Sequence, residues 1–150
     1  MLHMIRMMLY DYVHADDSKF IALMKDFVQT YAGKPASTAG FKAICDKHFA
    51  RDMSWFFNQW VYGTDIPKIK IEYSVVDKAD GPTLVIDATQ QGVPESFRSV
   101  LPFVMRTKSG MSMGTLGIGK PVMHGELKLK EKPDSVEFNP LYGLLCELDV

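Results

Sequence analysis

The feature that most constrains the fold is an aromatic segment at residues 51–63, which reads RDMSWFFNQWVYG. Five of its large apolar residues recur at the spacing of one helical face: Met53, Phe56, Phe57, Trp60 and Val61. That face must be buried. Trp55 and Tyr62 fall on the opposite side of the same helix, so we expect a second surface to cover them as well.

The ends of this helix are marked by residues that stop helices. Asp52 can cap the N-terminus, Gly63 can end the helix in a left-handed turn, and Pro67 prevents its continuation. The apolar residues follow a helical period before this segment and alternate as in strands after it. The helix is therefore expected to lie where two halves of the chain meet.

Three further helices are predicted before residue 51. The first has the stripe Leu2, Ile5, Leu9, Tyr12 and Val13, and four methionines (Met1, Met4, Met7 and Met8) widen it until the helix is nearly all interior. We interpret the methionines as core filling rather than as metal ligands or a binding groove.

The second and third helices have clear boundaries. Asp16 can cap a helix with the face Phe20, Leu23, Met24, Phe27, Val28 and Tyr31, which Gly33 and Pro35 stop. Ser37 or Thr38 can cap the next helix, whose face is Phe41, Ile44, Cys45 and Phe49. Short connections favour antiparallel neighbours, so residues 1–63 are predicted to form a small helical array.

From Pro67 onward the period changes to two, as Ile69, Ile71 and Tyr73 alternate with polar residues. Further strands are predicted at 83–90, 100–107, 111–118, 122–130, 135–138 and 144–148, with Pro102 suggesting an edge or a bulge. About seven short antiparallel strands are typical of a β-sandwich. The predicted class is α+β, with a helical domain at 1–63 and a sandwich domain at 66–150.

Composition excludes several partners. The formal net charge is −1 and the sequence pI is about 6.4, so no basic field favours nucleic acid. No run approaches the roughly 20 apolar residues that span a bilayer, so no membrane span is predicted. The N-terminus is no signal peptide, and because it begins inside an apolar pattern without a capping residue, we expect the chain to be cut from a longer protein.

No catalytic, cofactor-binding or metal-binding residue is predicted. His3, His14, His48 and His124 stand in no His-Glu-x-x-His arrangement. Residues 114–120 have the glycine and lysine spacing of a phosphate loop, but Pro121 stands where a hydroxyl should bind magnesium, so turn and edge-strand glycines are favoured. Cys45 and Cys146 are interpreted as two reduced, buried thiols rather than a bridge, and Cys45, on an apolar helix face, as inert. The aromatic group at 55–62 is favoured as core over a ligand platform.

The sequence resembles the C-terminal half of the M1 family of zinc aminopeptidases. The residues that carry the resemblance are 2–6 (LHMIR), Phe20 and Leu23, Gly33-Lys34, Thr38 with Phe41, 51–60 (RDMSWFFNQW), Ile66-Pro67, and, less specifically, Gln90 or Gln91, Leu101-Pro102 and 136–140 (VEFNP). One departure is Ala39-Gly40, where acidic residues usually follow the capping threonine.

The resemblance implies that the helices are the last part of a thermolysin-like catalytic domain and that the strands form a small Ig-like β-sandwich. The family's Gly-x-Met-Glu-Asn loop, its zinc motif and its transition-state tyrosine all lie N-terminal to the segment seen here, and Tyr10 and Tyr12 do not stand at that tyrosine's place. The zinc therefore belongs to the parent enzyme by resemblance, and this segment is expected to be inactive alone.

In the parent the segment would shape one wall of the cleft, with the zinc-binding half and the peptide substrate as its partners. The isolated chain is expected to expose apolar surface and to self-associate. The alternative is an independent, non-catalytic protein-binding module whose sandwich presents loops or an edge strand. A hydrolase with a site built from His and Asp is a weaker third hypothesis.

Overall fold

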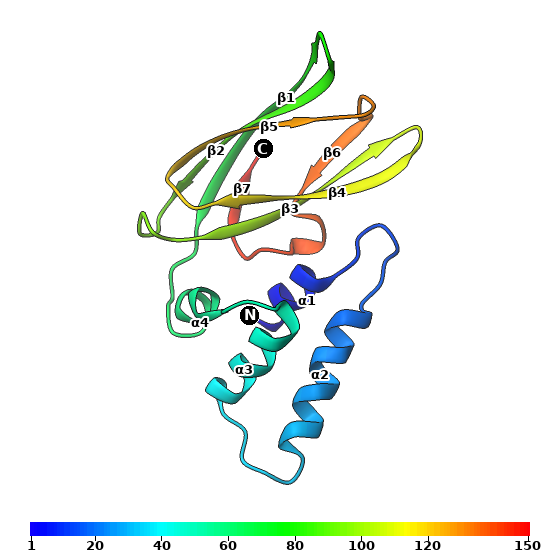
Figure 1. The fold of residues 1–150 in the computed structure, drawn as a ribbon. Coiled ribbons are helices and arrows are strands. Elements are labelled where there is room, and N and C mark those ends of the chain that lie inside the picture. Colours follow the sequence, from blue (N-terminus) through cyan, green and yellow to red (C-terminus); the bar gives the residue numbers. More distant parts are fainter. The chain divides into compact units, whose positions relative to one another are not determined.

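The computed structural model describes residues 1–150 as two compact units, one at 1–64 and one at 65–150. The first contains the helices α1 (Leu2–Leu9), α2 (Ser18–Tyr31), α3 (Thr38–Phe49) and α4 (Ser54–Trp60) (Figure 1). The second contains β1 (Lys68–Lys78), β2 (Gly81–Gln91), β3 (Ser99–Thr107), β4 (Gly110–Ile118), β5 (Val122–Lys128), β6 (Ser135–Phe138), a short 3-10 helix (Pro140–Tyr142) and β7 (Glu147–Asp149). The predicted α+β class is confirmed, with four helices followed by seven strands.

The boundaries of α2 and α3 follow the predicted signals. The Ser37 hydroxyl caps α3 by accepting the backbone N–H of Gly40 at 3.1 Å. Gly33 adopts the left-handed conformation beyond α2, with φ +67°. The N-cap residue of α2 is Asp17, one residue after the predicted Asp16. The Asp16 carboxylate still stabilises the start of the helix, because it accepts the backbone N–H and the hydroxyl of Ser18.

The first helix is shorter than predicted. It ends at Leu9, and the extension to Val13 is wrong because the Asp11 carboxylate accepts the backbone N–H groups of Val13 and His14 and so stabilises a turn instead. The helix is also not nearly all interior. Met4, Ile5 and Met7 are buried, whereas the side chains at its first turn, Met1 and Leu2, are 38% and 47% exposed.

The aromatic helix α4 spans only seven residues, from Ser54, whose backbone N–H the Asp52 carboxylate accepts at 3.1 Å. Its inner face is buried as predicted at Met53, Phe56 and Phe57. The prediction that both faces are covered is wrong for Tyr62, which is 67% exposed.

Gly63 does not adopt the predicted left-handed conformation after α4. Its lack of a side chain matters because a Cβ would lie 2.6 Å from the carbonyl oxygen of Gln59. The glycine therefore permits a close approach of backbone to backbone, not a left-handed cap.

Ring contacts and one polar cluster connect the helices. Phe57 of α4 contacts Phe41 of α3 edge-on at 6.1 Å between centroids, and Phe41 contacts Phe27 of α2 at 5.0 Å. Asp46 of α3 accepts the backbone N–H of Met53 at 2.7 Å, just before α4. These contacts hold three helices around one small core.

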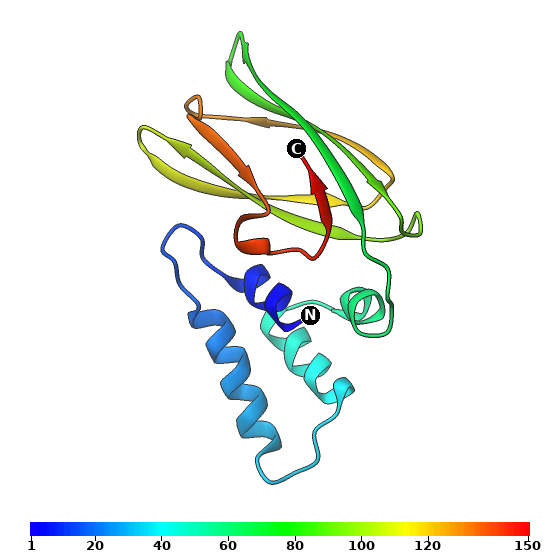
Figure 2. The same cartoon turned by 180° about the vertical axis from the view of Figure 1, so that it is seen from behind.

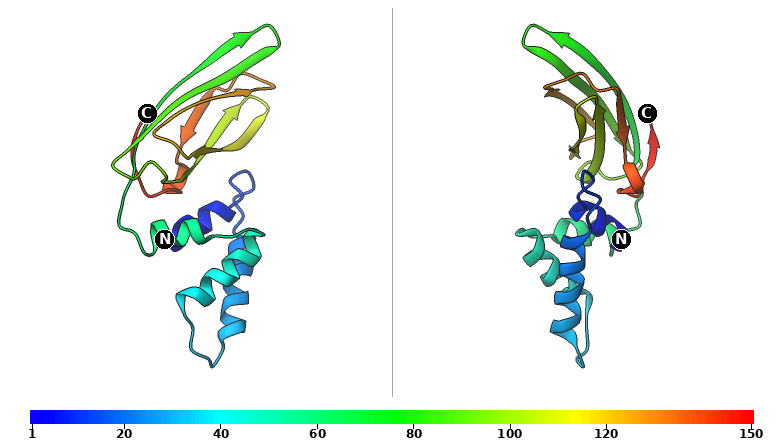
Figure 3. Two further views of the ribbon diagram at one scale, coloured as in Figure 1. Left: turned by 60° about the vertical axis from the view of Figure 1, so that its left-hand side comes forward. Right: turned by 90° about the vertical axis from the view of Figure 1, so that its right-hand side faces the viewer.

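The strands form two sheets, ordered β5-β2-β1-β7 and β4-β3-β6. All pairs are antiparallel except β1 and β7, which run parallel over three residue pairs, so an entirely antiparallel sandwich is a wrong expectation in that detail. Figure 2 shows β7, in red, beside the first part of β1. In every view the β1–β2 hairpin extends beyond the other strands (Figure 3). Tyr73 and Val76 of β1 are exposed.

Pro102 occupies a central strand, so the predicted edge or bulge is wrong. Its carbonyl accepts the backbone N–H of Asn139 at 2.8 Å, on the side of β3 where β6 has just ended at Phe138. Asn139 has φ +55°, and the chain leaves the sheet at this residue. Strand β6 therefore offers no carbonyl that the missing backbone N–H of Pro102 would have to pair with.

The sandwich core lies between the facing sides of the two sheets. Ile69, Ile71, Leu84 and Ile86 on one sheet and a second set on the other, Leu101, Phe103, Leu116, Ile118 and Phe138, are all buried. Tyr73 of β1 contacts Phe138 of β6 at 5.2 Å between ring centroids, which joins the sheets directly.

Glycine 114 makes one of the tightest contacts in this core. A Cβ at Gly114 would lie 2.2 Å from Cζ of the buried Phe103, whereas a Cβ at Gly117 of the same strand would meet nothing within 4 Å. We expect Gly114→Ala to lower the free energy of unfolding by about 1–3 kcal/mol through overpacking. Gly117→Ala, the matched control, should change it by less than about 0.5 kcal/mol. Urea unfolding of both variants checks this, and equal effects would contradict it.

Candidate functional site

Three of the four histidines lie beside carboxylates, and His124 lies beside two of them, Asp87 and Glu126. His14 Nδ1 lies 2.7 Å from Asp11, and His48 Nε2 lies 2.9 Å from Asp26. His124 Nδ1 lies 2.7 Å from the carboxylate of Asp87, which raises the pKa of the imidazole. Nowhere in the chain do three or more His, Cys, Asp or Glu side chains gather into a group able to hold a metal ion. The donors present therefore do not fit a zinc centre, which needs at least three protein ligands.

The potential nucleophiles are in unfavourable surroundings. Cys45 on α3 is buried as predicted, whereas Cys146 is only half-buried, so that prediction is wrong for Cys146. Loss of solvent around each free thiol still raises its pKa to about 11. Burial also raises the pKa of Tyr12 to about 12, and its buried hydroxyl has no hydrogen-bond partner. None of these groups is positioned beside a base, and the glycine-rich stretch 114–120 forms the second half of β4 and the turn after it.

An apolar groove of about 350 Å³ lies on the helical unit. Its apolar lining comes from both ends of the unit and from α2 and α3: Met1, Leu2, Met24, Phe27, Phe41 and Val61. Beside it, α2 buries only Leu23 completely, and Ile21 and Val28 on the same helix are 48% and 62% exposed. The apolar face of α2 is therefore only partly buried within these 150 residues.

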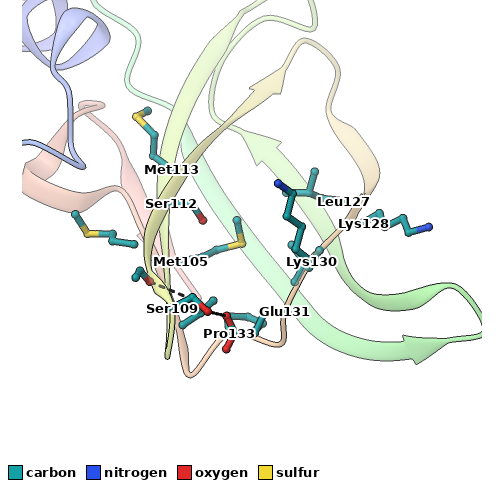
Figure 4. Close-up of a pocket in the computed structure, with 13 residues that line it drawn as sticks. Met105, Ser109, Ser112, Met113, Leu127, Lys128, Lys130, Glu131 and Pro133 are labelled. Atoms are coloured by element: carbon teal, nitrogen blue, oxygen red, sulfur yellow. Dashed lines mark hydrogen bonds between the residues drawn. The ribbon is translucent and has the colours of Figure 1, made fainter.

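A cleft of about 740 Å³ lies in the sandwich, and we call it the seam (Figure 4). It lies between β4, the edge of one sheet, and the last part of β5 with the segment after it, the edge of the other. In Figure 4, Met105, Ser112 and Met113 stand on one side, and Leu127, Lys128 and Lys130 on the other.

One end of the seam is closed by a side-chain contact. The Ser109 hydroxyl, in the β3–β4 turn, donates to the Glu131 carboxylate at 2.6 Å, and this hydrogen bond lowers the pKa of Glu131. At the other end only residues 119–121 connect β4 to β5. The seam is thus a bounded opening between two edge strands.

The seam was not predicted from the sequence. The strands 111–118 and 122–130 were both expected, but the pairing that leaves both of them at edges was not deducible from the period of two. The one available signal was that 110–118 contains three glycines and no charged residue, which is unusual for an exposed edge.

No helix of the chain is of a length and composition that could cross a membrane.

The raised thiol pKa values predict slow modification. Because burial disfavours the thiolate, at pH 8 we expect Cys45 and Cys146 to present about a hundredfold less thiolate than an ordinary cysteine. Reaction with a thiol reagent should be correspondingly slow in the native chain and fast in urea. The variants Cys45→Ser and Cys146→Ser assign each phase, and rapid native labelling would contradict the prediction.

The exposed face of α2 predicts self-association of the 150-residue chain. We expect a sedimentation coefficient that rises with concentration and binding of an apolar dye. Val28→Glu should weaken both, because it places a charge in the middle of the exposed face, whereas Val122→Glu, at a similarly exposed residue of β5, should not. A strictly monomeric chain that binds no dye would overturn the expectation.

Comparison with known proteins gives a likeness in structure only. Neither a family model nor a curated protein matches the sequence. The fold matches part of the crystal structure of Legionella pneumophila aminopeptidase A in complex with aspartic acid, with a TM-score of 0.71 and 10% sequence identity. The match covers 99% of this chain but only 17% of that one, so this chain spans about a sixth of that protein's length. The chain therefore has the fold of one part of an aminopeptidase.

Proposed function

We propose that this chain is the non-catalytic, C-terminal part of an M1-type zinc aminopeptidase. The observation that carries the proposal is the match of helices and sandwich together, over 99% of the chain, to part of an aminopeptidase. The aromatic segment 51–60 and the Ile66-Pro67 turn, which resemble the M1 family, support it independently. Helices and an Ig-like sandwich in this order are what that family would require.

In this proposal the chemistry belongs to residues outside this chain. Three of the four histidines here lie beside carboxylates, and no group of three or more possible ligands gathers in the chain, so the zinc of the parent enzyme would be held elsewhere. The parent would release N-terminal residues from peptides. These helices would form one wall of its cleft.

The apolar face of the helical unit suits this structural role. The groove beside Met24 and Phe27 and the exposed Ile21 and Val28 offer a surface that another part of a larger protein would bury. Burial of one large apolar side chain contributes about 1.5–3 kcal/mol, so a few such residues make a substantial docking contribution.

The alternative function is an independent protein-binding module with a β-sandwich. The seam between β4 and β5 is the observation that favours it, because an unpaired edge strand beside an apolar cleft is a common peptide-binding arrangement. The two functions differ in whether the native polypeptide carries peptidase activity.

The proposal is tested on the native polypeptide, isolated from its source cells with an antibody against residues 1–150. We expect a species several times larger than 16.9 kDa that hydrolyses aminoacyl-coumarin substrates. A zinc chelator should abolish the activity and added Zn²⁺ should restore it.

Two outcomes would contradict the proposal. A native species of 16.9 kDa without peptidase activity would favour the binding module. A larger species whose activity is absent, or unaffected by the chelator, would show that the fold is used in a protein of another function. A parallel isolation from the same cells with an antibody that does not recognise residues 1–150 controls for contaminating peptidases.

A further inference from the structure

The seam leaves part of the sandwich interior uncovered. Leu127 pairs with Leu84, which is completely buried, and opposed residues of neighbouring strands lie on the same face of a sheet. Leu127 therefore faces the interior, yet it is 40% exposed. On the other sheet, Ser112 pairs with the buried Met105, faces inward and is also exposed. The two sheets do not close over each other at this edge.

The strand beside this opening is an unprotected edge. β4 is nine residues long, carries no charged residue and contains no proline. Other edge strands are protected by length or by charge: β6 and β7 have four and three residues, and β5 carries Glu126 and Lys128. A long, uncharged edge offers its free backbone N–H and C=O groups to another extended chain.

The opposite side of the seam selects the charge of that chain. Lys128 shares with Glu126 the face of β5 opposite to Leu127, and Lys130 lies two residues past the end of β5 and also lines the seam. Lys128 is paired with Asp80 at 2.8 Å, whereas the ammonium group of Lys130 makes no ion pair. A strand lying in the seam would therefore meet apolar side chains on its inner face and lie beside the unpaired ammonium group of Lys130.

We propose that the seam binds an extended peptide segment of another protein, in which apolar residues alternate with acidic ones. The segment adds to β4 as a new edge strand, places its apolar side chains over Leu127 and Met105, and places its carboxylates beside Lys128 and Lys130. A second copy of β4 would bring no carboxylate to Lys130, because β4 has no charged residue. The inference does not depend on the peptidase proposal, since binding is measured on this chain directly.

The test uses the 150-residue chain and the labelled peptide acetyl-Thr-Glu-Val-Glu-Val-Glu-Thr-amide, with binding followed by fluorescence anisotropy. We expect saturable binding, and hydrogen exchange should slow at residues 110–118. Replacing the three glutamates by lysines should abolish binding. Methylating the five central backbone nitrogens should do the same, because strand addition requires backbone donors.

Charge reversal in the chain gives the matched pair of variants. Lys130→Glu should raise the dissociation constant about tenfold, whereas Lys120→Glu, the same change in the exposed turn before β5, should alter it less than about twofold. Both residues are exposed, so neither variant is expected to impair folding.

Any of the following results with the peptides would overturn the proposal: no binding of the glutamate peptide, equal binding of the lysine peptide, binding that survives backbone methylation, or protection confined to the helical unit. Protection of residues 110–118 that rises with protein concentration in the absence of peptide would also overturn it, because it would assign the edge to a second copy of the chain.

Discussion

A chain of aromatic contacts is the interaction on which the helical unit depends. The rings of Phe56, Phe57, Phe41 and Phe27 follow one another at 5.0–6.1 Å between centroids and pass from α4 through α3 to α2. Because α4 has only seven residues, it has little stability of its own and relies on this packing. The same segment contains the most specific part of the proposed resemblance to a zinc aminopeptidase, and its Met53, Phe56 and Phe57 are residues of the core.

Much of the fold was predictable because periodicity and capping are local properties. The α2 and α3 boundaries depend on Gly33 and Ser37, which act within one turn of themselves. The order of helices before strands, and the existence of each strand, follow from the change of apolar period at Pro67. The turn at 11–16 was missed because the Asp11 carboxylate competes with the helix for two backbone donors, and apolar spacing does not report such competition.

Long-range pairing was not predictable. Three features depend on which strands become neighbours: the parallel pairing of β7 with β1, the central position of Pro102, and the edge positions of β4 and β5. The alternation of apolar and polar residues predicts a strand but not its neighbours. The seam follows from the same pairing. In the sequence, seam residues such as Leu127 and Lys130 are part of an ordinary alternation of apolar and polar residues. They line a cleft only because the two sheets do not close over each other beside them.

The contact between Phe103 and Gly114 has a consequence for strand register. β4 has one neighbouring strand, and it has no charged residue whose pairing would fix its alignment. A slip of one residue against β3 would turn every side chain to the other face. A slip of two would place Ser112 or Leu116 against the Phe103 ring, where even a Cβ does not fit. The alignment of β4 with β3 is therefore fixed by a single glycine, because only glycine fits against the Phe103 ring. This steric constraint places no requirement on the residues along the free edge of β4.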